Sequence, residues 1–194
     1  MTRYSATAPD GCLLEVEARQ QHRQLTLSYS FTNATTGDRA RSAYVFNRLY
    51  NEVDAKRVFQ TDPHLVYVTW DADSIVVSKK LFPVPSNVRV EAPVVPCTSR
   101  VAPGERLDET LILPVPLLCF APYPTPTVEY DGETAALAFE LGYFLAHPDG
   151  EKLAKIVETR QGSAPMFVPF PQGSQSLLRV EIGLAEPVAV LAQD

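Results

Sequence analysis

The chain has 194 residues, 45% of them hydrophobic and 21% charged, a composition that excludes extensive disorder and supports a full hydrophobic core. Its 23 acidic side chains against 17 Lys and Arg give a formal charge of −6, which disfavours nucleic acid and anionic lipid as partners. The N-terminus lacks a signal-peptide core, and no window approaches the length of a membrane span. We therefore expect a cytoplasmic chain that does not bind membranes or nucleic acid.

Alternation of apolar and polar residues with a period of two is the strongest pattern in the chain. It predicts strands that keep one face in a core and the other in water. The four clearest stretches are Leu14–Ala18, Leu25–Phe31, Leu137–Tyr143 and Leu178–Leu184.

In the first half of the chain, we expect strands at 12–19, 24–33, 43–47, 65–70 and 74–78. The short His22-Arg23 connection indicates a hairpin, and Asp71-Ala72-Asp73 is a second hairpin turn. Residues 48–59 show no clear period, so a loop or a single helical turn is expected there.

Ten prolines then fall between positions 83 and 126. Because proline cannot donate to a β-ladder, strands in this region are expected only at 107–113 and, in short form, at 87–91. Turn signals at 130–133 and 147–150 enclose a strand at 134–145. Residues 152–160 fit a return strand or a short helix, of which the strand is favoured, and a last strand is expected at 176–184 with an edge segment at 188–191.

Many short strands with almost no helix predict an all-β fold, a single antiparallel β-sandwich with long proline-rich connections. We expect one domain over residues 1–194, with residues 1–10 and 186–194 loosely ordered. The segments Leu25–Asn33, Val101–Glu105 and Leu111–Pro114 resemble bacterial immunoglobulin-like and fibronectin type III-like domains. This resemblance covers under a fifth of the chain and implies an immunoglobulin-like sandwich, without the Cys, Trp, Cys spacing of antibody domains. It implies nothing specific about activity.

Residues suited to catalysis are few. Three cysteines at wide spacing do not form a disulfide framework, and Cys119 lies in an apolar setting that would blunt a thiol. No nucleophile elbow or phosphate-binding glycine loop occurs. The histidines share no metal-ligand spacing, and each lies in a predicted turn; they are His22, His64 and His147. We expect no metal and no cofactor, and enzyme is the weaker hypothesis.

The most unusual segment is 114–130, where apolar and aromatic groups sit on a backbone that proline holds extended; residues 166–171 form a similar strip. Such strips lose little entropy on docking, so their rings are candidate binding residues. These rings are Phe120, Tyr123, Tyr130, Phe167 and Phe170. The alternative interpretation is that both strips are rigid connections whose rings fill the core.

Three functions follow from these patterns. The leading hypothesis is a non-catalytic interaction module that binds a protein partner or self-associates through the proline-rich strips. The second is a jelly-roll domain that binds or processes carbohydrate with Trp70, Asp71 and Asp73, although two such carboxylates are more often turn formers. The third is a small apolar ligand held between the sheets, which predicts a cavity there.

Overall fold

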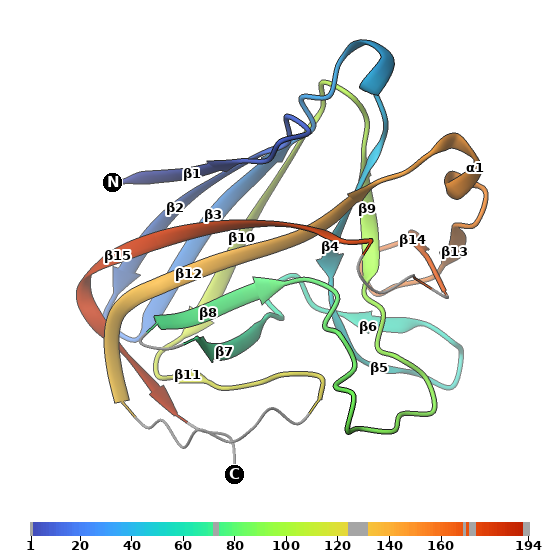
Figure 1. The fold of residues 1–194 in the computed structure, drawn as a ribbon. Helices are drawn as coiled ribbons and strands as arrows, with labels where there is room; N and C mark the ends of the chain where they lie inside the picture. The colour runs from blue at the N-terminus through green and yellow to red at the C-terminus, as the bar shows by residue number, and fades with distance from the viewer. Residues whose placement is uncertain (1, 72–73, 124–131, 169, 171–173, 192–194) are drawn as a thin grey trace.

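The computed structural model describes residues 2–71, 74–123, 132–168, 170 and 174–191. Almost all of the regular secondary structure in these residues is strand, so the all-β prediction is confirmed (Figure 1). Helix is limited to a short 3-10 turn, Gly37–Arg39, and to α1 (Pro148–Glu151). None of the helices in this part of the chain is long and apolar enough to span a membrane.

Four antiparallel strands form the first sheet, which we call sheet A. In spatial order they are β1 (Arg3–Thr7), β2 (Leu13–Gln21), β3 (Gln24–Thr32) and β10 (Arg106–Pro114). Along β2 and β3, alternate residues are buried, as the period of two predicts. The β2–β3 connection is a two-residue hairpin in which His22 adopts a φ of 52°.

The second sheet, sheet B, is mixed rather than purely antiparallel. Its strands are β4 (Ala43–Arg48), β7 (Tyr67–Asp71), β8 (Ser74–Lys79), β9 (Cys97–Val101), β11 (Leu117–Leu118), β12 (Gly132–Leu145) and β15 (Ser176–Leu191). β12 pairs with β15 along one edge and with both β4 and β8 along the other. Because β8–β12 and β11–β15 are parallel pairs, the prediction of an antiparallel architecture is wrong for this sheet.

Sheets A and B enclose the main hydrophobic core between their inner faces. Aromatic pairs cross from one sheet to the other: the ring centroids of Tyr29 and Phe139 lie 4.9 Å apart, and those of Phe31 and Tyr143 lie 5.1 Å apart. Such contacts stabilise a core beyond the area that they bury. Both ends of the chain take part in the sheets, through β1 and the last residues of β15.

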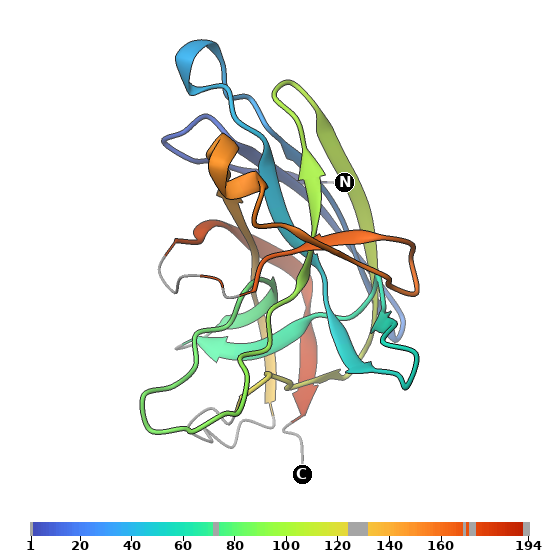
Figure 2. The ribbon, with the colours of Figure 1, turned by 90° about the vertical axis from the view of Figure 1, so that its right-hand side faces the viewer.

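A third layer covers part of the outer face of sheet B. It contains two hairpins, formed by β5 (Tyr50–Val53) with β6 (Phe59–Thr61) and by β13 (Lys155–Val157) with β14 (Ala164–Met166). β14 crosses β9, and Thr98 Oγ1 donates to Pro165 O at 2.8 Å (Figure 2). β4 is therefore buried on both faces, with Val45 in the main core and Phe46 in a second core beneath this layer.

Four local expectations differ from the structure. Residues 48–59 are not a loop, because β5 pairs with β6 around a turn closed by Asp54 and Val58. Residues 152–160 contain only the short strand β13, which α1 precedes. Residues 87–91 form no strand, and the tail from 176 to 191 is one long strand rather than two.

One buried ion pair links both sheets. Lys79 points inward from β8 and is fully buried; its Nζ donates to Asn47 O at 2.9 Å, Pro63 O at 2.8 Å and Glu109 Oε2 at 3.1 Å. Glu109, on β10, also accepts from the Tyr29 hydroxyl and, at 2.6 Å, from Asn47 Nδ2. The pair therefore joins sheet A, sheet B and the loop after β6.

Removing Lys79 leaves Glu109, whose side chain is 20% exposed, without its cation and with Tyr29 and Asn47 as its remaining partners. We expect Lys79→Met to lower the free energy of unfolding by about 3 kcal/mol or more in urea titrations. The matched control is Lys152→Met, which breaks an exposed ion pair with Asp149 and should change stability by less than about 1 kcal/mol. Equal effects of the two substitutions would contradict this role of Lys79.

Candidate functional site

The described rings of the first proline-rich strip pack against sheet B and its covering loop. Phe120 pairs with Val68 through two backbone hydrogen bonds, and its ring centroid lies 5.8 Å from that of Tyr67. Tyr123 is buried, and its hydroxyl accepts a hydrogen bond from the backbone N–H of Val94 at 2.7 Å. Tyr130 lies outside the described residues.

The rings of the second strip close the second core. Phe167 is buried against Tyr44 and Phe144, with centroid distances of 4.8 and 4.9 Å. Phe170 is half-buried against Phe46 and Phe144 at 5.3 and 4.9 Å. Tyr123 and Phe167 are therefore buried, whereas Phe120 and Phe170, the other two candidate residues that the structure describes, are partly exposed.

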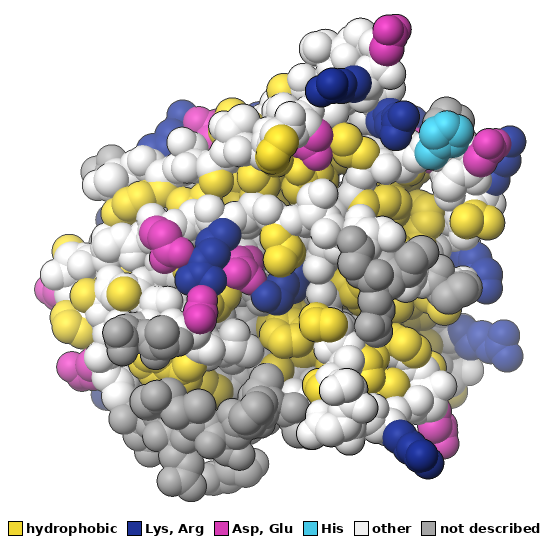
Figure 3. Space-filling view, in the orientation of Figure 1, with side chains coloured by type: hydrophobic (Ala, Val, Ile, Leu, Met, Phe, Trp, Pro, Cys, Tyr) yellow, Lys and Arg dark blue, Asp and Glu magenta, His cyan; other side chains and the backbone are white. Residues whose placement is uncertain are grey.

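Trp70 and Asp71 do not converge on one cleft. Trp70 is partly buried against the main core, whereas Asp71 points to the opposite side of β7. Asp71 Oδ2 accepts from Arg179 Nη1 at 2.6 Å, within a charged cluster on the outer face of sheet B (Figure 3). Arg179 also forms ion pairs with Glu140 and Glu181. The hydrogen bonds that its guanidinium donates to Glu181 and Asp71 raise its pKa. Asp73 lies outside the described residues.

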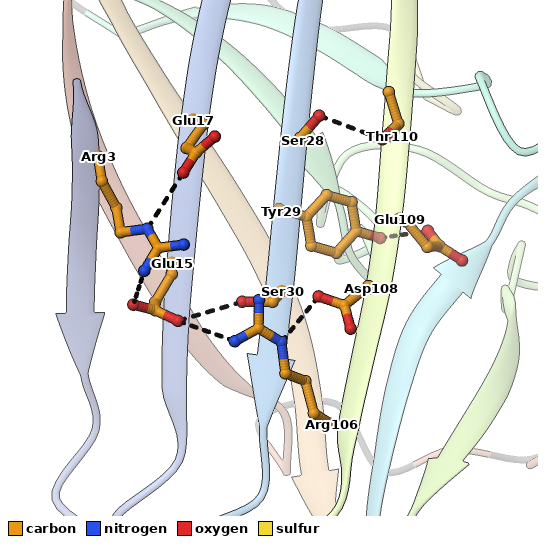
Figure 4. Close-up of a pocket in the computed structure, with 10 residues that line it drawn as sticks. All are labelled: Arg3, Glu15, Glu17, Ser28, Tyr29, Ser30, Arg106, Asp108, Glu109 and Thr110. Carbon is orange, nitrogen blue, oxygen red and sulfur yellow. Dashed lines mark hydrogen bonds and ion pairs between the residues drawn. The ribbon is translucent and has the colours of Figure 1, made fainter. Parts of the chain in front are cut away.

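The outer face of sheet A contains a shallow polar groove of about 270 Å³ (Figure 4). Its floor is β3, whose outward side chains here are Ser28 and Ser30, and longer side chains of β1, β2 and β10 form its walls. Ten residues line the groove: Arg3, Glu15, Glu17, Ser28, Tyr29, Ser30, Arg106, Asp108, Glu109 and Thr110. The groove exists because the outward side chains of β3 are short hydroxyl groups, whereas those of the neighbouring strands are longer.

The charges of this groove neutralise one another across the strands. Glu15 accepts from Arg3 Nη1 at 3.3 Å and from Arg106 Nη1 at 3.2 Å, so two edge strands are tied to one carboxylate. Arg3 also pairs with Glu17, and Arg106 with Asp108. Exposed pairs of this kind contribute little stability. Since each guanidinium already has carboxylate partners, the groove offers no free positive charge to an anionic ligand.

The histidines and cysteines serve the backbone or the cores. His64 Nδ1 accepts from Ile112 N at 3.3 Å, and His147 caps α1 by accepting from Asp149 N at 3.4 Å. Burial raises the pKa of the Cys12 thiol to about 12 and that of Cys97 to about 11, which suppresses their thiolate forms. Among the described residues, no three His, Cys, Asp or Glu side chains gather as a metal site.

Lys79 is the one buried amine whose chemistry needs attention, because buried lysines serve as nucleophiles in some enzymes. Burial lowers its pKa, and the Glu109 carboxylate opposes that shift. Three acceptors use the three N–H groups of an ammonium, and the side chain has no exposed surface. We assign Lys79 a structural role on this geometry.

The most exposed large apolar side chains lie at the outer layer. Leu153 and Ile156 are 71% and 67% exposed, and Val168 of the second strip is also exposed. Ile156 pairs with Pro165 across the β13–β14 hairpin. We call Leu153, Ile156, Pro165 and Val168 the hairpin patch. A further exposed pair, Leu118 and Leu191, lies in register at the β11–β15 edge.

Searches of protein-family models, of curated proteins and of solved structures found no match to this chain.

Neither the groove nor the hairpin patch was predicted from the sequence. The outward residues of β2 and β3 are visible in the alternation, but the strand order that brings Arg3 and Arg106 to Glu15 is not. Leu153 and Ile156 have the same spacing that a buried helix face would have, so the pattern gave no sign of their exposure.

Tyr29 provides a pH test of the buried cluster. Burial, followed by the charge of Glu109, raises its pKa well above the ordinary value of 10.0. Above pH 10 the unfolded chain therefore releases a proton that the folded chain retains, and stability falls by about 1.4 kcal/mol per pH unit for this group. We expect the loss of stability between pH 9 and 11 to be smaller by about that amount in Tyr29→Phe, measured by urea unfolding. Identical pH profiles would contradict the assignment.

Proposed function

We propose that the protein is a non-catalytic interaction module that associates with a second copy of itself through the hairpin patch. The observation that carries the proposal is the exposure of Leu153, just before the β13–β14 hairpin, and of Ile156 on it, while Ala164 and Met166 of the same hairpin pack in the second core. Burial of each side chain is worth about 1.5–3 kcal/mol, whereas association itself opposes binding by several kcal/mol. We therefore expect a weak dimer with a dissociation constant of roughly 10–100 μM.

Charge favours a second copy as the occupant. Exposed Lys155 and Glu158 flank Ile156 and Val157 on the hairpin. If the β13 strands of two copies run antiparallel, the end of the strand that carries Lys155 in each copy meets the end that carries Glu158 in the other. Such a surface is complementary to itself, as isologous interfaces require.

We also propose a β-sandwich architecture and a cytoplasmic location for this protein. The single core between sheets A and B supports a β-sandwich, whereas the consecutive order β1-β2-β3 is a meander and does not support the immunoglobulin-like topology. The free cysteines Cys12, Cys97 and Cys119 support the proposed cytoplasmic location. The carbohydrate alternative with Trp70, Asp71 and Asp73 is less favoured, because the Asp71 carboxylate already forms an ion pair with Arg179.

Sedimentation velocity between 5 and 200 μM protein, values chosen to span the expected constant, tests the association. The native chain should shift from monomer to dimer, and Leu153→Ser with Ile156→Ser should remain monomeric. Ile112→Ser with Leu177→Ser removes two exposed apolar side chains elsewhere, which are 44% and 48% exposed, and should leave the dimer unchanged. A monomeric native chain at the highest concentration would overturn the proposal.

A charge exchange tests the orientation of the two copies. Lys155→Glu places two like-charged contacts in the interface and should weaken the dimer by up to about tenfold. Adding Glu158→Lys to the same chain restores both ion pairs and should recover the native dissociation constant. Failure of the second substitution to rescue the first would exclude this two-fold arrangement.

A further inference from the structure

Two reactive side chains meet at one carboxylate between the two sheets. Lys79 Nζ donates to Glu109 Oε2 at 3.1 Å, and Asn47 Nδ2 donates to Glu109 Oε1 at 2.6 Å. Nζ also donates to the backbone oxygen of Asn47 at 2.9 Å. One carboxylate therefore holds an amine and a carboxamide side by side, each within the distance that proton transfer requires.

Both reacting side chains are enclosed. Lys79 is 0% exposed and Asn47 is 2% exposed, so water has little access to compete with a reaction between them. Asn47 Oδ1 is buried and accepts no hydrogen bond from any described residue, so its carboxamide is held only through Nδ2. Burial lowers the pKa of Lys79, although Glu109 opposes this shift, and the neutral amine is the nucleophilic form of lysine.

Glu109 connects this enclosed pair with the surface. Its side chain is 20% exposed and lines the groove of sheet A, where the Tyr29 hydroxyl also donates to it (Figure 4). The carboxylate can therefore exchange protons with solvent while both reacting groups stay buried. A proton carrier needs this position, since it must take a proton from one group and give a proton to the other.

We propose that Lys79 and Asn47 condense into an intramolecular isopeptide bond, with Glu109 as the proton carrier. Glu109 takes a proton from Nζ, and the neutral amine attacks Cγ of Asn47, so that the Nζ–Cγ bond forms. Glu109 gives this proton to Nδ2, the Cγ–Nδ2 bond breaks, and ammonia leaves. Nζ loses a second proton, which stays on Glu109. The ammonium and the carboxylate thus become a neutral amide and a neutral carboxyl group, and no oxidant or other reactant is consumed.

The reaction relieves a cost and adds a link. It removes two charges from a buried position, where the loss of hydration opposes them. It also joins β4 to β8, which both pair with β12 but, in the described part of the chain, not with each other. The ion pair is the state of these residues before the reaction, and both states connect the same strands. The inference concerns the main core and does not depend on self-association through the hairpin patch.

Mass spectrometry of the denatured native chain tests the bond directly. We expect a mass about 17 Da below that of the sequence, because one ammonia is lost. Trypsin should release residues 42–48 and 58–80 as one branched peptide, since an acylated Lys79 is no longer a cleavage site. A native chain that keeps its full mass after prolonged incubation would overturn the proposal. The same mass loss without the branched peptide would also overturn it, because Asn47 can lose ammonia by closing on its own backbone.

Two variants assign the roles of the side chains. Asn47→Ala removes the carboxamide and should give no branched peptide. Glu109→Gln removes the proton carrier and should slow the linkage by about 100-fold or more, within the range of general acid–base catalysis. Asn51→Ala, on exposed β5, is the matched control and should still lose ammonia.

The amide spectrum of each variant, recorded before digestion, reports whether the chain is folded. A folded Glu109→Gln chain that forms the branched peptide at the native rate would refute the role of Glu109. A branched peptide from Asn47→Ala would place the bond elsewhere and refute the proposal. If Glu109→Gln does not fold, the mass and the peptides of the native chain alone decide whether the bond exists.

Discussion

The buried pair between Lys79 and Glu109 is the constraint on which the arrangement of the layers depends. A charge without exposed surface must be matched by acceptors from several elements, and here they come from β4, β10 and the loop after β6. Displacing any of these elements would leave an ammonium or carboxylate unpaired inside the protein. We therefore expect the pair to favour one register of sheet A against sheet B.

The second core and the loop beside it bury most of the aromatic rings that are described in the proline-rich strips. Sheet B is wider than sheet A, so the outer faces of β4 and β8 need a separate cover. Phe167 and Phe170 supply this cover over Phe46 and Phe144, while Tyr123 fixes the loop that contains Val94. Val168 of the second strip remains exposed, as do Leu153 and Ile156 of the preceding segment.

The positions of the strands could be predicted from the sequence more accurately than the pairing between them. Alternation along β2, β3, β12 and β15 reports local burial, which is why those strands were found. β1 begins with Arg3, and its outward polar residues hide a strand that only pairing with β2 reveals. Likewise, Lys79 follows an apolar run and was not singled out, because its partner Glu109 lies thirty positions later and on another sheet. Sites that depend on tertiary pairing leave no local signal.

Native-state hydrogen exchange tests most directly whether the buried pair makes the two sheets one cooperative unit. We expect the amides of Leu27 and Leu111 in sheet A to exchange with the same free energy as those of Val77 and Phe139 in sheet B, and all four values to fall together in Lys79→Met. If sheet A instead exchanged at a lower free energy than sheet B in the native chain, the pair would not hold the layers together.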